Sequence, residues 1–466
     1  MVSEFVVFSL LLAGIIILIA FASEILNRVT RIPNIVFYLI FALILGPLGL
    51  RLLHPGIIIP NLELFDLIIS MALALVIFEG GYSFNRCFAP ITNEGMKIQM
   101  KECKPISLRL LLPRILRLVV IGGAITASLT AFLFLSLAGF PFELAILCGV
   151  LCAITGPTVI NPILRELEVK EEVAETLQGE GEFNDGIFAV IAAVIFSAIL
   201  LELSGFGAVI IIPLQIAIFL ILGFLVGVII GLIGIGFTKY IEPKIINYGG
   251  TRINPSIWTA IEQMGLLCVA FLAYGIGSLI GFEAAILSTL IAGLLLGQRH
   301  RFQKDPAKTT IEENETEIIE AEIHSFQLPL TNIAIATIFI LALAFVDLGL
   351  IMHLITFQVI FVGLILVIAL ILVVRPIGVL LSTIRSDFTL RERAFMSFFA
   401  PRGVIIAALG FSFALEFIIE GYYISWGELM LFYIFLIVFI SVLLQGGLAP
   451  YIAKRMLTEK KDTQES

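Results

Sequence analysis

The chain has 466 residues, of which 60% are hydrophobic and only 14% are charged. Because soluble globular domains carry about 25% charged residues, this composition excludes a soluble enzyme or binding domain and predicts a protein solvated by lipid. Much of the acid behind the net charge of -8 lies in residues 305–324, which we expect to form a solvated loop. No long basic patch with interleaved aromatic residues predicts binding to nucleic acid.

The first apolar segment, residues 5–24, is too long for a signal peptide and has no basic region ahead of it, so we expect it to be the first span. A helix needs about 20 apolar residues to cross a bilayer. Phe outnumbers Trp by 38 to 2, which favours a helix bundle over an aromatic-girdled β-barrel. The predicted fold is an all-α polytopic membrane protein with about 13 transmembrane helices, at 5–24, 33–52, 63–82, 114–137, 142–164, 173–202, 207–236, 256–280, 282–298, 326–349, 354–376, 392–417 and 425–453.

Lys and Arg concentrate in every second connection between these spans, with Arg51 as the exception. Positively charged loops stay in the cytoplasm. The tail, 454–466, is also basic, so we expect a cytoplasmic C-terminus and, with thirteen spans, an external N-terminus. The expected location is the cell membrane. The predicted cytoplasmic loops are 25–32, 83–113, 165–172, 237–255, 299–325 and 377–391.

Two pairs of similar segments predict an internal repeat. "LALVIFEGG" in span 3 aligns with "LALAFVDLG" in span 10, and "TGPTVINPIL" in span 5 aligns more weakly with "APRGVIIAAL" in span 12. Both pairs are seven spans apart, and an odd offset means opposite directions through the membrane, as in an inverted-topology repeat. We therefore predict one transmembrane unit, 1–466, in which 5–202 (spans 1–6) and 256–453 (spans 8–13) are the repeats and 207–236 is the linker.

Proline and glycine interrupt span 5 at Gly156, Pro157 and Pro162, and span 12 at Pro401 and Gly403. Broken backbone is tolerated at membrane depth only where protein or water satisfies it. A plain packing kink is one interpretation of each break. Corresponding breaks in two repeats, however, point to a binding site near the membrane midplane.

Span 6 contains three acids in "QGEGEFNDGIFAV", residues 178–190. If the helix begins near Val173, Asp185 lies about 18 Å along it, close to the middle of a hydrocarbon core about 30 Å thick. A charge there costs about 2.5 to 3.5 kcal/mol, so Asp185 is a functional candidate. Glu182 is expected to face the loop and to be expendable.

Arg402 lies deep in span 12 and needs an acidic partner, because a buried guanidinium does not lose its proton. Glu180 is the leading partner, and Glu79 and Glu262 are competitors. Pairing with Glu180 would leave Asp185 free to exchange ligands.

The neighbours of Asp185 offer further oxygen ligands. Asn184 is adjacent to it in the chain, Glu180 shares a helix face with Asn184, and Thr155 and Thr158 flank the break of span 5, so these four residues and Asp185 are the predicted ion ligands. A desolvated carboxylate in such a shell binds either a proton or a monovalent cation, but not easily both. Competition for one site predicts antiport. The four histidines are scattered and no Cys-x-x-Cys pair occurs, so we expect no zinc site and no cofactor.

Five motifs carry a resemblance to a known family: "FEGGYSF", "TGPTVINPIL", "EGEFNDG", "VVRPIGVLLST" and "APRGVIIAAL". In this order they resemble the NhaP-type sodium/proton antiporters of the monovalent cation/proton antiporter family over nearly the whole chain. The resemblance implies thirteen helices in inverted repeats, two broken helices that cross, a homodimer and an elevator-like motion of a core domain.

The same resemblance implies roles for individual residues. Asp185 would bind the ion and carry the proton, with Asn184 as its neighbour and Thr155 as the threonine of the broken helix. Glu180 would pair with Arg402. The Asn-Asp pair implies electroneutral one-for-one exchange.

The chain departs from the family pattern at Gly156, where many members have Asp, and at Gly181, where Ser is frequent. These departures leave the choice of Na⁺ over K⁺ or Li⁺ open. The expected partners are this cation, H⁺, the bilayer and a second copy of the chain.

Three alternatives to a Na⁺/H⁺ antiporter remain. The first is a K⁺/H⁺ antiporter with the same mechanism. The second is a passive channel, which would not move protons stoichiometrically. The third is an intramembrane aspartyl hydrolase, which would need Asp347 or Glu262 to face Asp185.

Overall fold

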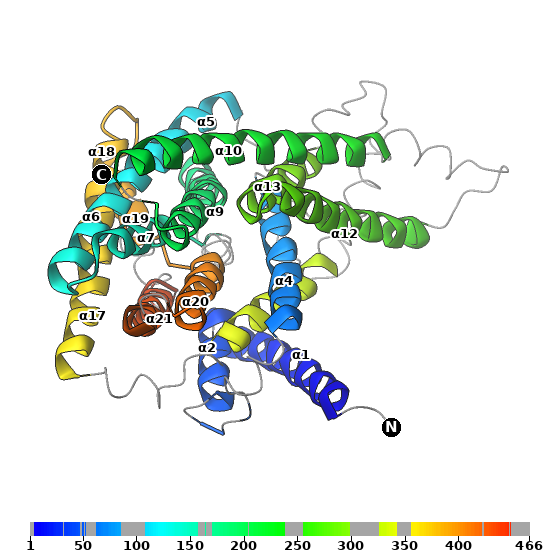
Figure 1. The fold of residues 1–466 in the computed structure, drawn as a ribbon. Helices are drawn as coiled ribbons and strands as arrows, with labels where there is room; N and C mark the ends of the chain where they lie inside the picture. The colour runs from blue at the N-terminus through cyan, green and yellow to red at the C-terminus, as the bar shows by residue number, and fades with distance from the viewer. Residues whose placement is uncertain are drawn as a thin grey trace, which may run out of the picture. The chain divides into compact units, whose positions relative to one another are not determined.

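The computed structural model describes the helical parts of the chain and the shorter connections between them (Figure 1). Within these residues all regular structure is helical, which confirms the predicted all-α class. The described residues are 4–30, 32–46, 49–50, 52, 62–84, 108–156, 164, 170–203, 205–237, 255–298, 326–342, 356–421, 424–446 and 448.

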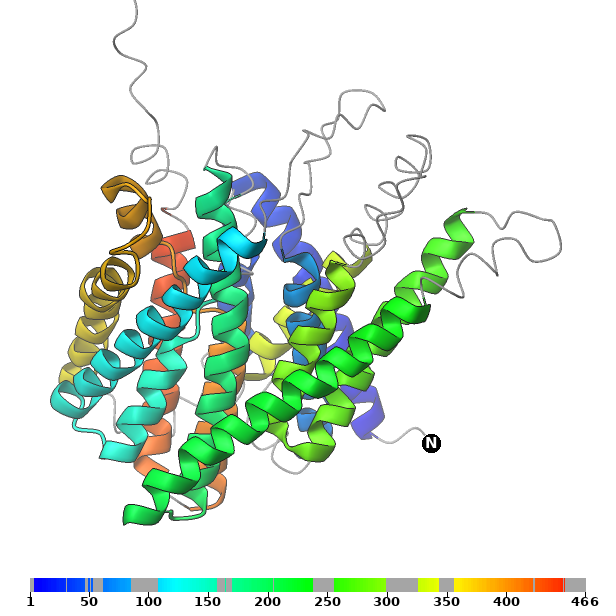
Figure 2. The same cartoon turned by 90° about the horizontal axis from the view of Figure 1, so that it is seen from above.

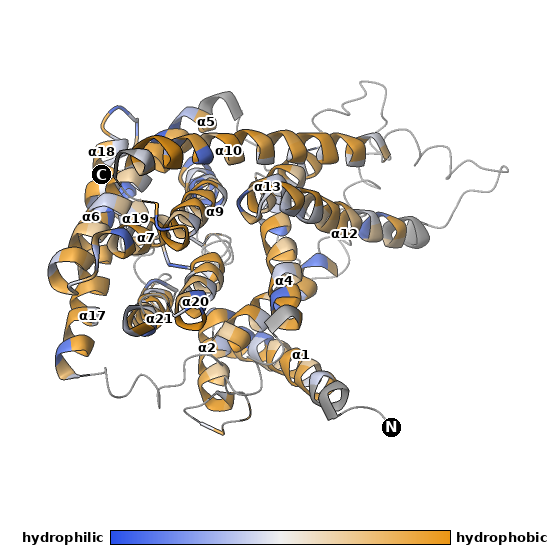
Figure 3. Ribbon diagram, in the orientation of Figure 1, coloured by the Kyte–Doolittle hydropathy of each residue, from blue (hydrophilic) through white to orange (hydrophobic). Residues whose placement is uncertain are grey.

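Eight of the described helices are long and apolar enough to cross a membrane, and five shorter apolar helices lie between them. In chain order they coincide with the thirteen predicted spans, so the chain is a multi-pass membrane protein. The helices α10 (Gly205–Gly236), α12 (Pro255–Ile280) and α17 (Phe357–Ala369) consist mostly of hydrophobic residues (Figure 3). Many of their large hydrophobic side chains are exposed, as contact with lipid requires. The predicted loop 305–324 and Asp347 lie outside the described residues.

The chain divides into two compact units. The first unit combines Met1–Ala22, Leu53–Pro105 and Ala189–Leu341. The second combines Ser23–Leu52, Ile106–Phe188 and Ala342–Ser466. Two helices, α1 (Glu4–Thr30) and α9 (Glu171–Leu200), contribute residues to both units.

The first unit is built around α13 (Phe282–Gly297), which packs against α4 (Leu62–Ser83), α10 and α12 (Figure 2). A helix that is apolar all round must be buried, and most of α13 is. Glycines let the helices approach closely. A Cβ atom on Gly227 of α10 would lie 2.5 Å from the carbonyl oxygen of Ser288 in α13.

Three described spans of the second unit contain a π-helical turn. The first runs through α5 (Leu108–Arg117), η2 (Leu118–Gly122) and α6 (Gly123–Leu137). The second runs through α17, η5 (Leu370–Val374) and α18 (Arg375–Ser382). The third is the last predicted span, where the turn comes at its end.

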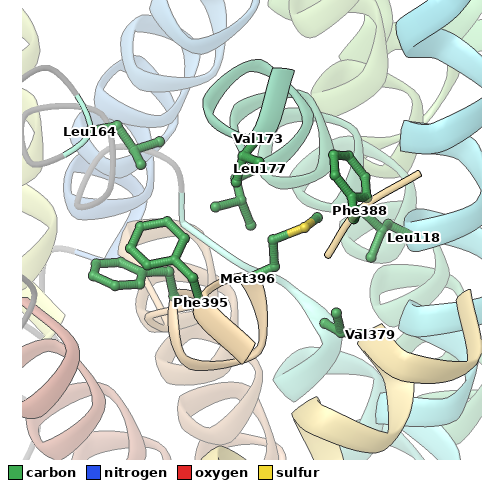
Figure 4. Close-up of a cluster of buried hydrophobic side chains, with 9 residues drawn as sticks. Leu118, Leu164, Val173, Leu177, Val379, Phe388, Phe395 and Met396 are labelled. Carbon is green, nitrogen blue, oxygen red and sulfur yellow. The ribbon is translucent and has the colours of Figure 1, made fainter. Parts of the chain in front are cut away.

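The remaining helices of the second unit carry the broken spans and their neighbours. A core of apolar side chains joins the start of α9, through Val173 and Leu177, to α19, through Phe395 and Met396 (Figure 4). This core fixes the part of α9 that carries the acids. The helices are α2 (Asn34–Leu45), α7 (Phe142–Ala153), α19 (Leu390–Phe398), α20 (Val404–Ile419), and α21 (Ile424–Ser441) with η6 (Val442–Gly446).

The packing of α10 on α13 generates a stability prediction. Gly227→Ala would place a methyl group against backbone that cannot move aside, and overpacking of this kind costs about 1 to 3 kcal/mol. We expect a lower melting temperature in detergent, measured by size-exclusion chromatography after heating. Gly265→Ala in α12 is the control, because a Cβ atom there meets nothing within 4 Å. Equal melting temperatures for the two variants would contradict the close packing.

Candidate functional site

Both predicted helix breaks are present in the second unit. The span that begins with α7 leaves the helix after Ala153, with extended backbone at Ile154 (φ -65°, ψ 129°). The other break separates α19 from α20, and Gly403 at its end is also extended (φ -102°, ψ -150°). Pro157, Pro162 and the predicted ligand Thr158 lie outside the described residues.

The two breaks cross in direct contact. The backbone N–H of Gly156 donates a hydrogen bond to the carbonyl of Pro401 at 3.0 Å. A Cβ atom on Gly156 would lie 2.6 Å from the Cα atom of Gly403, and one on Gly403 would lie 2.7 Å from the Cα atom of Gly156. Glycine is therefore required on both sides. The bond also satisfies backbone groups that the breaks release from their helices.

Helix α9 presents the predicted site residues to this crossing. Asn184 Nδ2 donates to Thr155 Oγ1 at 3.1 Å and contacts Glu180 Oε1 at 3.4 Å. All three side chains are buried, and Asp185 beside them is 6% exposed. Among the described residues, Asp185 Oδ1 and Asn184 Oδ1 have no hydrogen-bond partner. The structure thus brings together four of the five predicted ligands, and two of them, Asn184 and Asp185, each keep one side-chain oxygen without a hydrogen bond.

The predicted partner of Glu180 is wrong. Glu180 pairs with Arg375, not with Arg402: Arg375 Nη2 donates to Glu180 Oε2 at 2.6 Å, and Nη1 donates to Oε1. Both side chains are 3% exposed or less, so this is a buried bidentate ion pair. The predicted span 354–376 placed Arg375 at the membrane surface. In the structure the span continues through η5 and α18 to Ser382, which carries Arg375 into the interior.

Arg402 has other partners. Its Nη1 donates to the carbonyl of Ala400 at 2.8 Å, and its backbone N–H donates to Ser441 Oγ at 3.1 Å. It lines a small pocket together with Arg375, Ser441 and Gln445. The alternative acids, Glu79 and Glu262, belong to the first unit.

Glu182 also differs from expectation, because it is buried, with 2% of its surface exposed. The helix begins at Glu171, so Glu182 lies about three turns inside it. Glu182 and Asp185 are three residues apart and share a face of α9. Glu182 is therefore a second buried carboxylate next to Asp185.

Sequence reasoning missed Arg375, Ser441 and Gln445 as parts of this region. The signal for Arg375 was present in "VVRPIGVLLST", where the apolar run continues beyond the arginine. Ser441 and Gln445 are polar residues in the apolar stretch "FISVLLQGG", four positions apart on one helix face.

The chemistry of these groups suits small cations. Carboxylate, amide and hydroxyl oxygens, together with carbonyls released at the breaks, are hard ligands. A carboxylate that has lost its water regains favourable interactions by binding a proton or a cation. Glu180 is already neutralised by Arg375, so Asp185 is the carboxylate that the geometry leaves available.

Comparisons with known proteins identify the family and the fold of the chain. A family model described as sodium/hydrogen exchanger, transmembrane, matches residues 14–455. The chain is 25% identical over 451 residues to Na(+)/H(+) antiporter 1 of Methanocaldococcus jannaschii, covering 92% of both chains. It is 26% identical over 420 residues to probable Na(+)/H(+) antiporter 2 of that organism, covering 86% of this chain and 82% of the relative.

The fold matches a solved structure as well. The sodium proton antiporter MjNhaP1 from Methanocaldococcus jannaschii at pH 8 superimposes with a TM-score of 0.73 and 21% identity. The match covers 98% of this chain and 100% of the other. It shows that the two chains share a fold.

The Glu180–Arg375 pair can be tested by a double-mutant cycle. Glu180→Gln or Arg375→Gln alone leaves a buried charge unpaired, which costs about 3 to 5 kcal/mol. We expect the double variant to recover a large part of the lost melting temperature in detergent. The matched control is Glu180→Gln with Arg402→Gln, for which we expect a smaller recovery, because Arg402 lies near this pair but donates its side-chain hydrogen bond to Ala400. Coupling of Glu180 to Arg402, with none to Arg375, would contradict the observed pairing.

Proposed function

Because this chain belongs to the family of transmembrane sodium/hydrogen exchangers, we propose that it is a Na⁺/H⁺ antiporter in which Na⁺ and H⁺ compete for Asp185. The observation that carries this proposal is the buried Asp185 with an uncommitted Oδ1, next to Asn184 and to Thr155 at the crossing of the breaks. One carboxylate cannot hold both ions at once. Alternating access to such a site couples the two fluxes in opposite directions.

The Glu180–Arg375 pair supports one-for-one exchange. Arg375 neutralises Glu180, and Asp185 is a separate buried carboxylate that a single monovalent ion can neutralise. A neutral group is the least costly to keep inside a membrane, and one Na⁺ or one H⁺ achieves this for Asp185. Both loaded forms then carry the same charge, so the exchange is electroneutral.

The wider parts of the proposal follow from the family. We place the antiporter in the cell membrane as a homodimer, with its N-terminus outside and its C-terminus in the cytoplasm. Alternating access takes the form of an elevator-like movement of a core domain. The division of the chain into two compact units supports such a movement. Na⁺ is the leading substrate, and K⁺ exchange by the same mechanism is the alternative.

Asp185→Asn tests the central claim. The amide keeps the size of the side chain but binds neither a proton nor a cation with comparable strength. In proteoliposomes with an internal pH dye, we expect ΔpH-driven Na⁺ exchange to fall about 100-fold or more, and the same assay with K⁺ and Li⁺ gives the cation preference. Retention of full coupled exchange by Asp185→Asn would exclude the mechanism. Proton movement that follows an imposed membrane potential, not the Na⁺ gradient, would indicate a channel.

Glu182→Gln tests the second buried carboxylate. Removal of its negative charge weakens the attraction of the site for Na⁺, so we expect the KM for Na⁺ to rise about threefold to tenfold. Glu171→Gln is the control, because it removes the same charge from an exposed position on the same helix. Equal KM values for the two variants would show that Glu182 has no influence on the site.

A further inference from the structure

The extended segment that crosses Gly156, residues 399–403, needs partners for the backbone groups it releases from α19 and α20. Pro401 has no N–H group, and its carbonyl accepts the bond from Gly156. The next N–H group, that of Arg402, has no acceptor within its own span. It reaches across to Ser441 Oγ, at 3.1 Å.

Ser441 is placed to hold this segment. It is the last residue of α21, is 1% exposed, and is followed at once by the π-helical turn η6. Its hydroxyl donates to the carbonyl of Val438 at 3.1 Å, which leaves an oxygen lone pair directed to Arg402. π-helical turns that interrupt helices are frequent at functional sites.

A continuous series of contacts joins Ser441 to the cation ligands. Ser441 accepts the N–H of Arg402, and the adjacent Pro401 accepts the N–H of Gly156. Gly156 follows Thr155 in the chain, and Thr155 Oγ1 accepts the bond from Asn184. The position of the break in span 12 therefore determines where Thr155 and Asn184 lie relative to Asp185.

We propose that Ser441 is a positioning residue for the cation site: it fixes the break of span 12 and, through Pro401 and Gly156, the placement of Thr155 and Asn184. Ser441 does not touch the ion. This inference rests on the proposed antiport function. It assigns to span 13 a part in setting cation affinity.

Ser441→Ala removes the acceptor with the loss of a single heavy atom. A buried N–H group then lacks its partner, and the break moves to find another. We expect the KM for Na⁺ in proteoliposomes to rise about fivefold to tenfold while the maximal rate changes less than about twofold. Ser441→Thr keeps the hydroxyl, and we expect it to restore most of the Na⁺ affinity.

Ser382→Ala is the matched control in the same unit. Ser382 is also buried, and its hydroxyl donates to the carbonyls of Gly378 and Val379 in its own helix. Loss of this hydroxyl should leave both the KM and the maximal rate within about twofold of wild type. Melting temperatures of both alanine variants, measured in detergent, separate a change in the site from general destabilisation.

The outcomes distinguish this inference from the proposed function. If wild type exchanges Na⁺ for H⁺ and Ser441→Ala has the same KM as Ser382→Ala, the positioning role is wrong and the antiport stands. A fall in maximal rate without a change in KM also overturns the positioning role. If wild type itself shows no coupled exchange in this assay, the proposed function fails.

Discussion

The contact between Gly156 and Gly403 is the constraint on which the site depends. Two interrupted spans can cross inside a membrane domain only if their backbones satisfy one another, and here they approach too closely for any side chain at either position. The bond from Gly156 to Pro401 fixes the register of the crossing. Thr155 precedes Gly156 directly, so the same contact determines where its hydroxyl meets Asn184. The absence of a side chain at position 156 therefore has a physical reason in this chain.

The Glu180–Arg375 pair is the second fixed element, and its value lies in geometry more than in net stability. Burial of two charges costs several kcal/mol each, and their attraction roughly repays that cost. A bidentate pair does, however, hold both planar groups in one orientation. Glu180 Oε1 thereby becomes a fixed neighbour of Asn184, whose amide is held between Glu180 and Thr155.

The parts of this arrangement that local chemistry determines could be predicted from the sequence. The lengths of the apolar segments predicted the thirteen spans, and the positions of Gly and Pro residues predicted both helix breaks. The depth of Asp185 followed from its distance along an uninterrupted helix. Glu180 was assigned the wrong arginine because the depth of Arg375 depends on how far the eleventh span continues beyond a π-helical turn. The burial of Glu182 depends on which elements surround α9, and the hydrogen bond from Arg402 to Ser441 joins two different spans. Contacts between distant parts of the chain leave no periodic pattern in a single sequence, so neither feature could be predicted.

Because a side chain is excluded at position 156, the carboxylates at the crossing come from α9, and helical geometry divides them. At about 100° per residue, Glu180 and Asn184 share one face, whereas Glu182 and Asp185 share another face that is turned well away from it. The first face carries the neutralised pair and the amide that contacts the broken span. The second carries Asp185, the carboxylate whose charge a proton or a cation can compensate. Binding of a proton or a cation to Asp185 then changes the charge of the second face. The hydrogen bonds that hold the crossing lie on the first face and stay intact. The site can therefore accept either ion without a change of shape.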